Sequence, residues 1–215
     1  MCEAHFCSRW KGDWDMGKAF SEEERAQVQE NLRRIGLRLF AEKGMRGVSI
    51  RELTSKAGIA QGGFYTFYED KEDFLIDLMA FRVEEKLLIL KKKREESLEN
   101  PTDYLVDIFF SQGMRLKENK AFDNAVSGTL ELFFRAETKM SARISGLYRD
   151  YFEFMNRYWK DNGYRVEADI DGLMSIVRAA GVLFSNASLI GEDYFGEIYK
   201  TFCRAEVTRF LRVSR

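Results

Sequence analysis

Residues 49–71 read SIRELTSKAGIAQGGFYTFYEDK, and this stretch decides the fold. Ser49 can accept a hydrogen bond from the N–H of Glu52, and the Glu52 carboxylate can return one to Ser49, which makes a capping box. Gly58 is a natural helix stop, because glycine accepts the left-handed conformation that a C-terminal cap requires. The stretch therefore predicts two short helices joined by a tight turn, the second running from about 60 to 68.

A short exposed helix after a glycine turn is typical of the helix-turn-helix motif, whose second helix enters the DNA major groove. The amide of Gln61 can pair with adenine, and the cation of Arg51 can reach guanine or phosphate. Lys71 combines an ammonium group with a helix N-terminus, which itself favours anions. The residues expected to contact DNA are Ser49, Arg51, Gln61, Gly62, Gly63, Tyr65, Thr66 and Lys71.

From about Asn31 to Leu78 the chain resembles the DNA-binding domain of the TetR family of transcriptional regulators, over the segment LRLFAEKGMRGVSIRELTSKAGIAQGGFYTFYEDKEDFL. The resemblance implies an all-helical homodimer with an N-terminal DNA reader and a C-terminal domain that senses a ligand and dimerises. It also implies that Tyr65 and Lys71 contact phosphate. The residues that carry it are Phe40, Gly44, Ser49, Ile50, Ala57, Gly58, Gly62, Tyr65, Tyr68 and Lys71.

Two positions depart from the common pattern of that family. Ala60 stands where a capping Ser or Thr is frequent, and Gly63 replaces a frequent Thr. Two adjacent glycines also cost a helix about 1 kcal/mol each relative to alanine. We therefore expect a reader helix that starts loosely and becomes more ordered on DNA.

The rest of the chain reads as long amphipathic helices. Ser21 and Glu24 form a second capping box before a helix that Gly44 ends, and Asp70 caps a helix that reaches about residue 94. Asn100 and Pro101 start the next helix, as cap and first residue. Further helices are expected over residues 120–139, 141–162, 168–190 and 194–213.

The C-terminal part of the chain is rich in aromatic and methionine side chains, which suits a pocket for an apolar or aromatic effector. An ordinary core is at least as good an interpretation of each residue alone. Arg115, Glu131 and Arg135 could supply a polar anchor. The residues expected to line the pocket are Phe109, Phe110, Met114, Phe133, Phe134, Tyr151, Phe154, Met155, Tyr158, Trp159 and Phe184.

The last two predicted helices are candidates for a dimer interface. Small residues interleave with large ones over 168–190, so another backbone can approach closely, and two such helix pairs can form a four-helix bundle across a two-fold axis. The alternative is that both helices only complete the core of one chain. The expected interface residues are Ala180, Leu183, Ala187, Phe202 and Phe210.

Composition excludes several classes of protein. The formal net charge of −1 argues against a non-specific nucleic-acid binder, and no apolar run or leader pattern predicts a membrane or secreted protein, so the cytoplasm is the expected compartment. Cys2, His5 and Cys7 fall one ligand short of a closed zinc site, and this is the chain's one histidine. No metal or other cofactor is predicted.

We therefore expect an all-α chain with an N-terminal extension over 1–20, a helix-turn-helix domain over 21–69 and a ligand-binding and dimerisation domain over 70–215. The predicted function is a repressor that a lipophilic or aromatic small molecule releases from a palindromic operator. One alternative is a helical adaptor with a vestigial DNA reader. A small helical enzyme is less favoured, because the sequence has no nucleophile motif and no glycine-rich phosphate loop. Activation in place of repression stays open.

Overall fold

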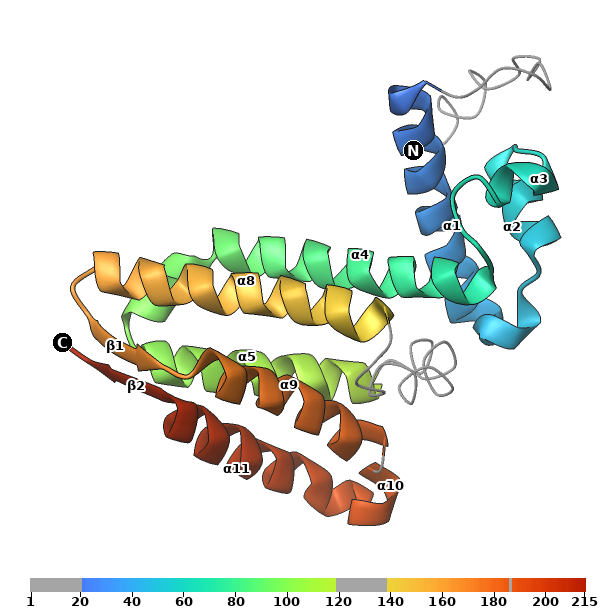
Figure 1. The fold of residues 1–215 in the computed structure, drawn as a ribbon. Coiled ribbons are helices and arrows are strands. Elements are labelled where there is room, and N and C mark those ends of the chain that lie inside the picture. Colours follow the sequence, from blue (N-terminus) through green and yellow to red (C-terminus); the bar gives the residue numbers. More distant parts are fainter. Residues whose placement is uncertain (1–20, 119–138, 186) are drawn as a thin grey trace, which may run out of the picture. The chain divides into compact units, whose positions relative to one another are not determined.

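The computed structural model describes residues 21–118, 139–185 and 187–215 (Figure 1). The predicted N-terminal extension and the predicted helix over 120–139, with Phe133, Phe134, Glu131 and Arg135, lie outside these residues. The contacts divide the chain into two compact units, residues 1–74 and 75–215, and helix α4 (Lys71–Lys92) crosses the division. The fold is all-α, as predicted, apart from one short pair of strands. No helix in the described segments is long and apolar enough to cross a bilayer.

The first unit begins with α1 (Glu22–Gly47), which has the predicted capping box: Glu24 N donates to Ser21 Oγ at 3.2 Å, and Ser21 N donates to Glu24 Oε2 at 2.8 Å. The helix is interrupted where the sequence predicts its end, because Gly44 has φ 68°. Helices α2 (Ile50–Ala57) and α3 (Gln61–Phe64) follow, and α4 then begins.

The α4 cap was also predicted, since Asp73 N donates to Asp70 Oδ1 at 2.8 Å. The side chains that α1, α2 and α4 bury in this unit are mostly apolar and include Leu32, Leu39, Leu53 and Phe74. A side chain caps the N-terminus of each of these three helices.

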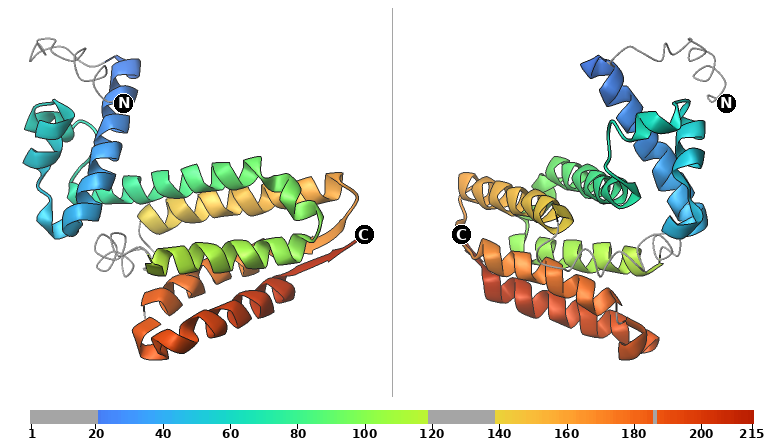
Figure 2. Two further views of the ribbon diagram at one scale, coloured as in Figure 1. Left: turned by 180° about the vertical axis from the view of Figure 1, so that it is seen from behind. Right: turned by 45° about the vertical axis from the view of Figure 1, so that its right-hand side comes forward.

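The second unit is a helical bundle. After the part of α4 beyond residue 74 come a 3-10 helix η1 (Arg94–Leu98), α5 (Pro101–Glu118), α8 (Lys139–Asp161), α9 (Ile170–Ser185), α10 (Ala187–Ile190) and α11 (Glu192–Phe210). Asn100 caps α5 as predicted: its Oδ1 accepts from Thr102 N and Asp103 N, each at 3.1 Å. Helix α11 packs on α5 and α9, and α8 packs on α9 (Figure 2).

One expectation about the helices of this unit was wrong, and a strand pair was missed. Within the helix expected over 168–190, the described residues form α9 and α10, and residue 186 between them lies outside the described residues. The helix expected to reach residue 213 ends at Phe210, where the chain extends into β2 (Leu211–Ser214). That strand pairs antiparallel with β1 (Arg165–Ala168), with Val166 opposite Val213, and the sequence analysis missed both strands (Figure 1). Each strand is only four residues long, and the strand that pairs with it is far away in the sequence.

The core of the second unit contains a buried polar link. Trp159 is 1% exposed, and its Nε1 donates to Ser97 Oγ at 2.7 Å. The Ser97 hydroxyl is itself buried and donates to the Arg94 carbonyl at 2.5 Å. The link joins α8 to η1, and it satisfies an indole N–H that has no access to water.

Ser97→Ala should lower the free energy of unfolding by about 1–3 kcal/mol, because it leaves the Trp159 N–H buried without an acceptor. Ser175→Ala is the matched control, since the Ser175 hydroxyl donates only to Gly172 O within its own helix at 2.6 Å. The control should stay within about 0.5 kcal/mol of wild type. Urea unfolding at one fixed protein concentration measures both, and equal stability of the two variants would contradict the assignment.

Candidate nucleic-acid interface

The corner between α2 and α3 has the geometry that the sequence predicts. Ser49 Oγ accepts from Glu52 N at 3.1 Å, and Gly58 adopts the left-handed conformation at φ 74°. Ile59 N then donates to the Thr54 carbonyl at 3.0 Å. One half of the expected capping box is absent, because the Glu52 carboxylate instead accepts from Lys43 Nζ at 2.5 Å. The corner is thus tied to the end of α1 by an ion pair.

Helix α3 is shorter than expected, with only Gln61–Phe64 in helical form. Ala60 supplies no side-chain cap, and the two glycines follow after Gln61. Tyr65 N donates back to Gly62 O at 3.2 Å, and Phe67 N donates to Phe64 O at 3.0 Å, so the chain continues as tight turns and not as α-helix. The expected helix over 60–68 is therefore corrected to a single turn, for the reason that glycine and a missing cap disfavour propagation.

Phe64 anchors this single turn. Its side chain is 0% exposed and packs on Tyr68 at 5.3 Å and on Phe74 at 5.6 Å between ring centroids. Tyr68 and Phe74 lie 4.8 Å apart with an interplanar angle of 62°. Because one face of α3 is buried in this aromatic cluster, the neighbouring side chains of the turn must point elsewhere.

The residues expected to contact DNA mostly lie on the outside of the corner. Gln61, Gly62 and Thr66 are exposed, and Tyr65 is 54% exposed although its ring touches Phe64 edge-on. Ser49 and Arg51 on α2 are exposed too, whereas Gly63 and Lys71 are half-buried. A Cβ on Gly62 would meet nothing within 4 Å, so packing inside the chain does not require glycine there.

Two of these residues also hold the corner together. Lys71 Nζ donates to the Val48 carbonyl at 3.0 Å, which ties the start of α4 to the residue before the α2 cap. Thr66 Oγ1 donates to Gly63 O at 2.6 Å. A phosphate contact by Lys71 would therefore come from an ammonium group that the chain already holds in position.

The sequence analysis did not predict that Arg25 contacts the end of the α3 turn. Its Nη2 donates to the Thr66 carbonyl at 3.2 Å, and its guanidinium lies 5.2 Å from the centroid of the Phe67 ring. The side chain thus clamps the end of the α3 turn from α1. Lys56, in the last turn of α2, is a further exposed cation near the corner. No local motif marks Arg25, because its partner is 41 residues away.

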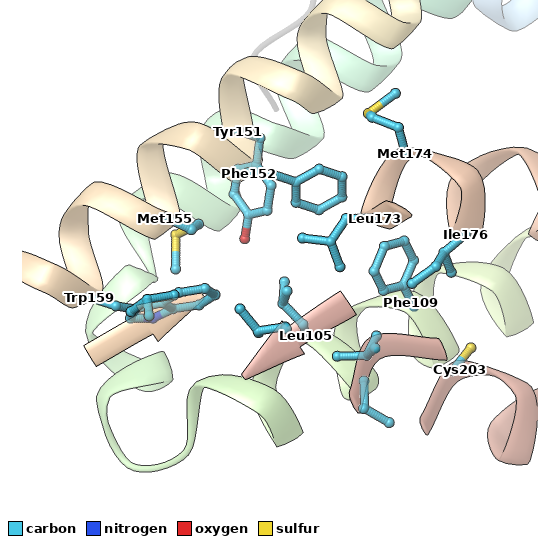
Figure 3. Packing of buried hydrophobic residues seen from close by; sticks show 14 of the residues in the cluster. Leu105, Phe109, Tyr151, Phe152, Met155, Trp159, Leu173, Met174, Ile176 and Cys203 are labelled. Atoms are coloured by element: carbon cyan, nitrogen blue, oxygen red, sulfur yellow. The ribbon is translucent and has the colours of Figure 1, made fainter. Parts of the chain in front are cut away.

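Where they are described, the residues expected to line an effector pocket belong to one apolar core cluster (Figure 3). Phe109, Tyr151, Met155 and Trp159 are buried in one cluster. Phe110, Met114, Phe154, Tyr158 and Phe184 are partly buried against it. Arg115, a candidate polar anchor, has a side chain outside the described part of the structure.

Tyr151 is the unusual member of this core. It is 1% exposed, and its hydroxyl points into the cluster in Figure 3. No acceptor or donor among the described residues meets Tyr151 Oη with the geometry of a hydrogen bond. Burial raises the pKa of this phenol, and the nearby Tyr104 raises it further. A buried hydroxyl without a partner is costly, so its presence calls for an explanation.

The residues expected at a dimer interface are partly buried by contacts within their own unit. Phe210 packs inside the unit, since a Cβ on Gly172 would lie 2.1 Å from its ring. Phe202 stacks on Tyr199 at 6.1 Å, while Ala180, Leu183 and Ala187 are half-buried. The sequence analysis missed the exposed apolar side chains of the same helices, which are Val182 at 53%, Leu189 at 84%, Tyr194 at 67% and Ile198 at 46% exposure.

Comparisons with known proteins agree with this geometry. Residues 34–78 match the family described as bacterial regulatory proteins, tetR family. The HTH-type transcriptional regulator YerO of Bacillus subtilis is 24% identical over 178 residues, which are 76% of this chain and 61% of YerO. The chain thus matches less than two thirds of that relative's length.

Two solved structures share the fold. A TetR transcriptional regulator from Rhodococcus sp. RHA1 superposes with a TM-score of 0.66 at 16% identity, covering 85% of this chain and 97% of that one. RolR in complex with resorcinol superposes with a TM-score of 0.66 at 18% identity, covering 88% and 90%. Residues 34–78 of this chain, which contain the glycine corner and the exposed α3 turn, thus match the tetR family of bacterial regulatory proteins.

Proposed function

We propose that this chain is a sequence-specific DNA-binding repressor that a small apolar or aromatic molecule releases from its operator. Residues 21–69 would read DNA, and residues 70–215 would bind the effector and dimerise. The observation that carries the proposal is the outward face of the α3 turn, where Gln61 and Tyr65 are exposed while Phe64 between them is fully buried.

The chemistry of this face suits a duplex. The Gln61 amide can pair with adenine in the major groove, and the Tyr65 hydroxyl and Lys71 ammonium can donate to phosphates. Gly62 adds no side chain on the exposed side, so the backbone there can approach DNA closely. Arg51 and Lys56 on α2 bring further positive charge to the same corner.

A palindromic operator needs two such faces. Tyr194, Ile198, Thr201 and Ala205 are exposed and recur at spacings of four, three and four residues, so they share one side of α11. This stripe, in which Tyr194 and Ile198 are large exposed apolar side chains, supports a homodimer through α9 and α11, with two DNA-reading turns spaced for half-sites about 34–36 Å apart. The interface would use these residues in place of Phe202 and Phe210.

The effector proposal draws on two relatives of low identity. RolR was solved with resorcinol, and FadR from Bacillus subtilis, which superposes with a TM-score of 0.51 at 15% identity, was solved with stearoyl-CoA. The buried hydroxyl of Tyr151 is a ready partner for a polar group on an otherwise apolar ligand. Release from DNA would follow if the ligand binds better to a dimer whose two reading turns are wrongly spaced.

Gln61→Ala and Tyr65→Ala should each weaken binding to the DNA upstream of the protein's own gene by about 1–3 kcal/mol, which is the value of a good base or backbone contact. Fluorescence anisotropy at several salt concentrations measures the change. Gln61→Ala should reduce the preference for that DNA over a scrambled duplex, because base contacts carry the sequence.

Arg212→Ala, at an exposed site on β2, serves as the control and should bind DNA like wild type. An adaptor with a vestigial reader would show weak binding that none of these substitutions changes. That result would rule out the proposed function.

Tyr151→Phe separates a ligand role from a structural one. Deleting an unsatisfied buried hydroxyl should leave the free energy of unfolding unchanged or raise it by roughly 1–3 kcal/mol. The same change should also weaken the response to a phenolic effector, for which resorcinol is the first probe. Because one hydrogen bond is lost, the effector concentration that releases DNA should rise by about 2–10-fold.

Trp159→Phe would not separate the two roles, because it also removes the hydrogen bond from Trp159 to Ser97 in the core. A Tyr151→Phe variant that is clearly less stable than wild type, yet responds to the effector normally, would show that the hydroxyl is structural.

A further inference from the structure

A cavity of about 390 Å³ lies at the C-terminal ends of α4 and α8, at the edge of the aromatic core. Its volume falls in the range of small-molecule sites, roughly 300–1,000 Å³. Four cationic side chains, two aromatic rings and one carboxylate line it: Lys91, Lys92, Arg94, Phe154, Arg157, Tyr158 and Asp161.

The two rings hold two of the cations in place. Phe154 and Tyr158 are four residues apart on α8 and stack at an interplanar angle of 6°. Lys91 Nζ lies 5.3 Å from the centroid of Phe154, and the Arg94 guanidinium lies 5.3 Å from that of Tyr158. Arg94 Nη1 also donates to the Lys91 carbonyl at 3.2 Å. Such contacts reduce the freedom of long side chains, so these cations are oriented before any ligand arrives.

Carboxylates do not neutralise the cations. Within the described residues, the salt bridges include none to Lys91, Lys92 or Arg94, while the adjacent Lys93 pairs with Glu96 at 3.5 Å. Arg157 has Glu153 at 4.0 Å, the limit of an ion pair, with both side chains largely in solvent. An exposed pair of this kind is weak.

The dipoles of α4 and α8 do not account for the four positive charges either. Cations at a helix C-terminus are expected, but each helix end carries only about half a negative charge. Two helix ends, Asp161 and the Glu153 partner of Arg157 together supply about three negative charges against four positive ones. About one positive charge therefore remains, and four cationic side chains line the site.

We propose that this cavity binds a small anion with two or more negative charges, of the phosphate-ester or polyphosphate class, as a second ligand site at the edge of the proposed effector core, with which it shares Phe154 and Tyr158. Phosphate oxygens match the donors of lysine and arginine, and Phe154 and Tyr158 offer apolar surface to the organic part of an ester. The four cations line one depression, and this arrangement favours a small molecule over the extended backbone of a nucleic acid.

Titration calorimetry on the full-length protein tests the site with three probes: tripolyphosphate, ADP and adenosine. Tripolyphosphate and ADP should bind, compete with each other and weaken as salt rises, whereas adenosine should not bind. The double variant Lys92→Gln with Arg157→Gln should lose at least about tenfold in affinity for tripolyphosphate, because charge-assisted contacts are the strong ones.

The control variant Lys160→Gln with Arg212→Gln removes the same charge from exposed positions outside the cavity and should bind like wild type. Both pairs of sites are exposed, so circular dichroism should confirm a folded protein in each case. Absence of binding at millimolar tripolyphosphate, or equal losses in both variants, would overturn the proposal.

Affinity for the DNA upstream of the protein's own gene provides an independent reading. It should be the same in the cavity variant and in the control variant. A selective loss of DNA binding in the cavity variant would mean that these cations contact nucleic acid, which also overturns the proposal. Neither result depends on whether the α3 turn reads DNA as proposed above.

Discussion

Burial of the Phe64 side chain is the constraint on which the proposed DNA reader depends. The ring is fully enclosed by the aromatic side chains of Tyr68 and Phe74. Removing such a side chain from a core costs about 3–5 kcal/mol, far more than a one-turn helix with two glycines can supply for itself. The orientation of α3 is therefore fixed from inside, and the outward direction of Gln61 and Tyr65 follows from it.

The corner combines a firm attachment with a weak helix. Lys71 bonds to the Val48 carbonyl before α2, and Arg25 bonds to the Thr66 carbonyl after α3, so both sides of the corner are tied to other helices. Between these ties, α3 has no side-chain cap. A segment of this kind can keep its position while its backbone remains able to adjust to a duplex, and this is the property that the proposed function requires.

The local features were predictable and the long-range ones were not. The caps at Ser21 and Asn100 and the left-handed turn at Gly58 follow from residue types a few positions apart, so the sequence alone indicates them. The strand pair of β1 and β2 and the clamp by Arg25 join residues more than 40 positions apart. The expected pocket residues were recognised as inward-facing, but a residue pattern cannot distinguish a packed core from a lined cavity. The small-residue pattern marked α9, and the expected interface residues Phe202 and Phe210 are partly buried and contact Tyr199 and Gly172 of the same unit, so their part in a dimer stays a prediction.

Hydrogen exchange at the α3 amides tests the central claim most directly. The amides of Gly63 and Tyr65 bond to Ala60 O and Gly62 O within a single turn that has no side-chain cap. The account predicts that these two amides exchange fast in the free protein and slow markedly when the DNA upstream of its own gene is added, with a scrambled duplex giving a smaller effect. The amide of Ile59, already bonded to Thr54, should change little. Equal exchange of Gly63 and Tyr65 with and without that DNA would contradict the account.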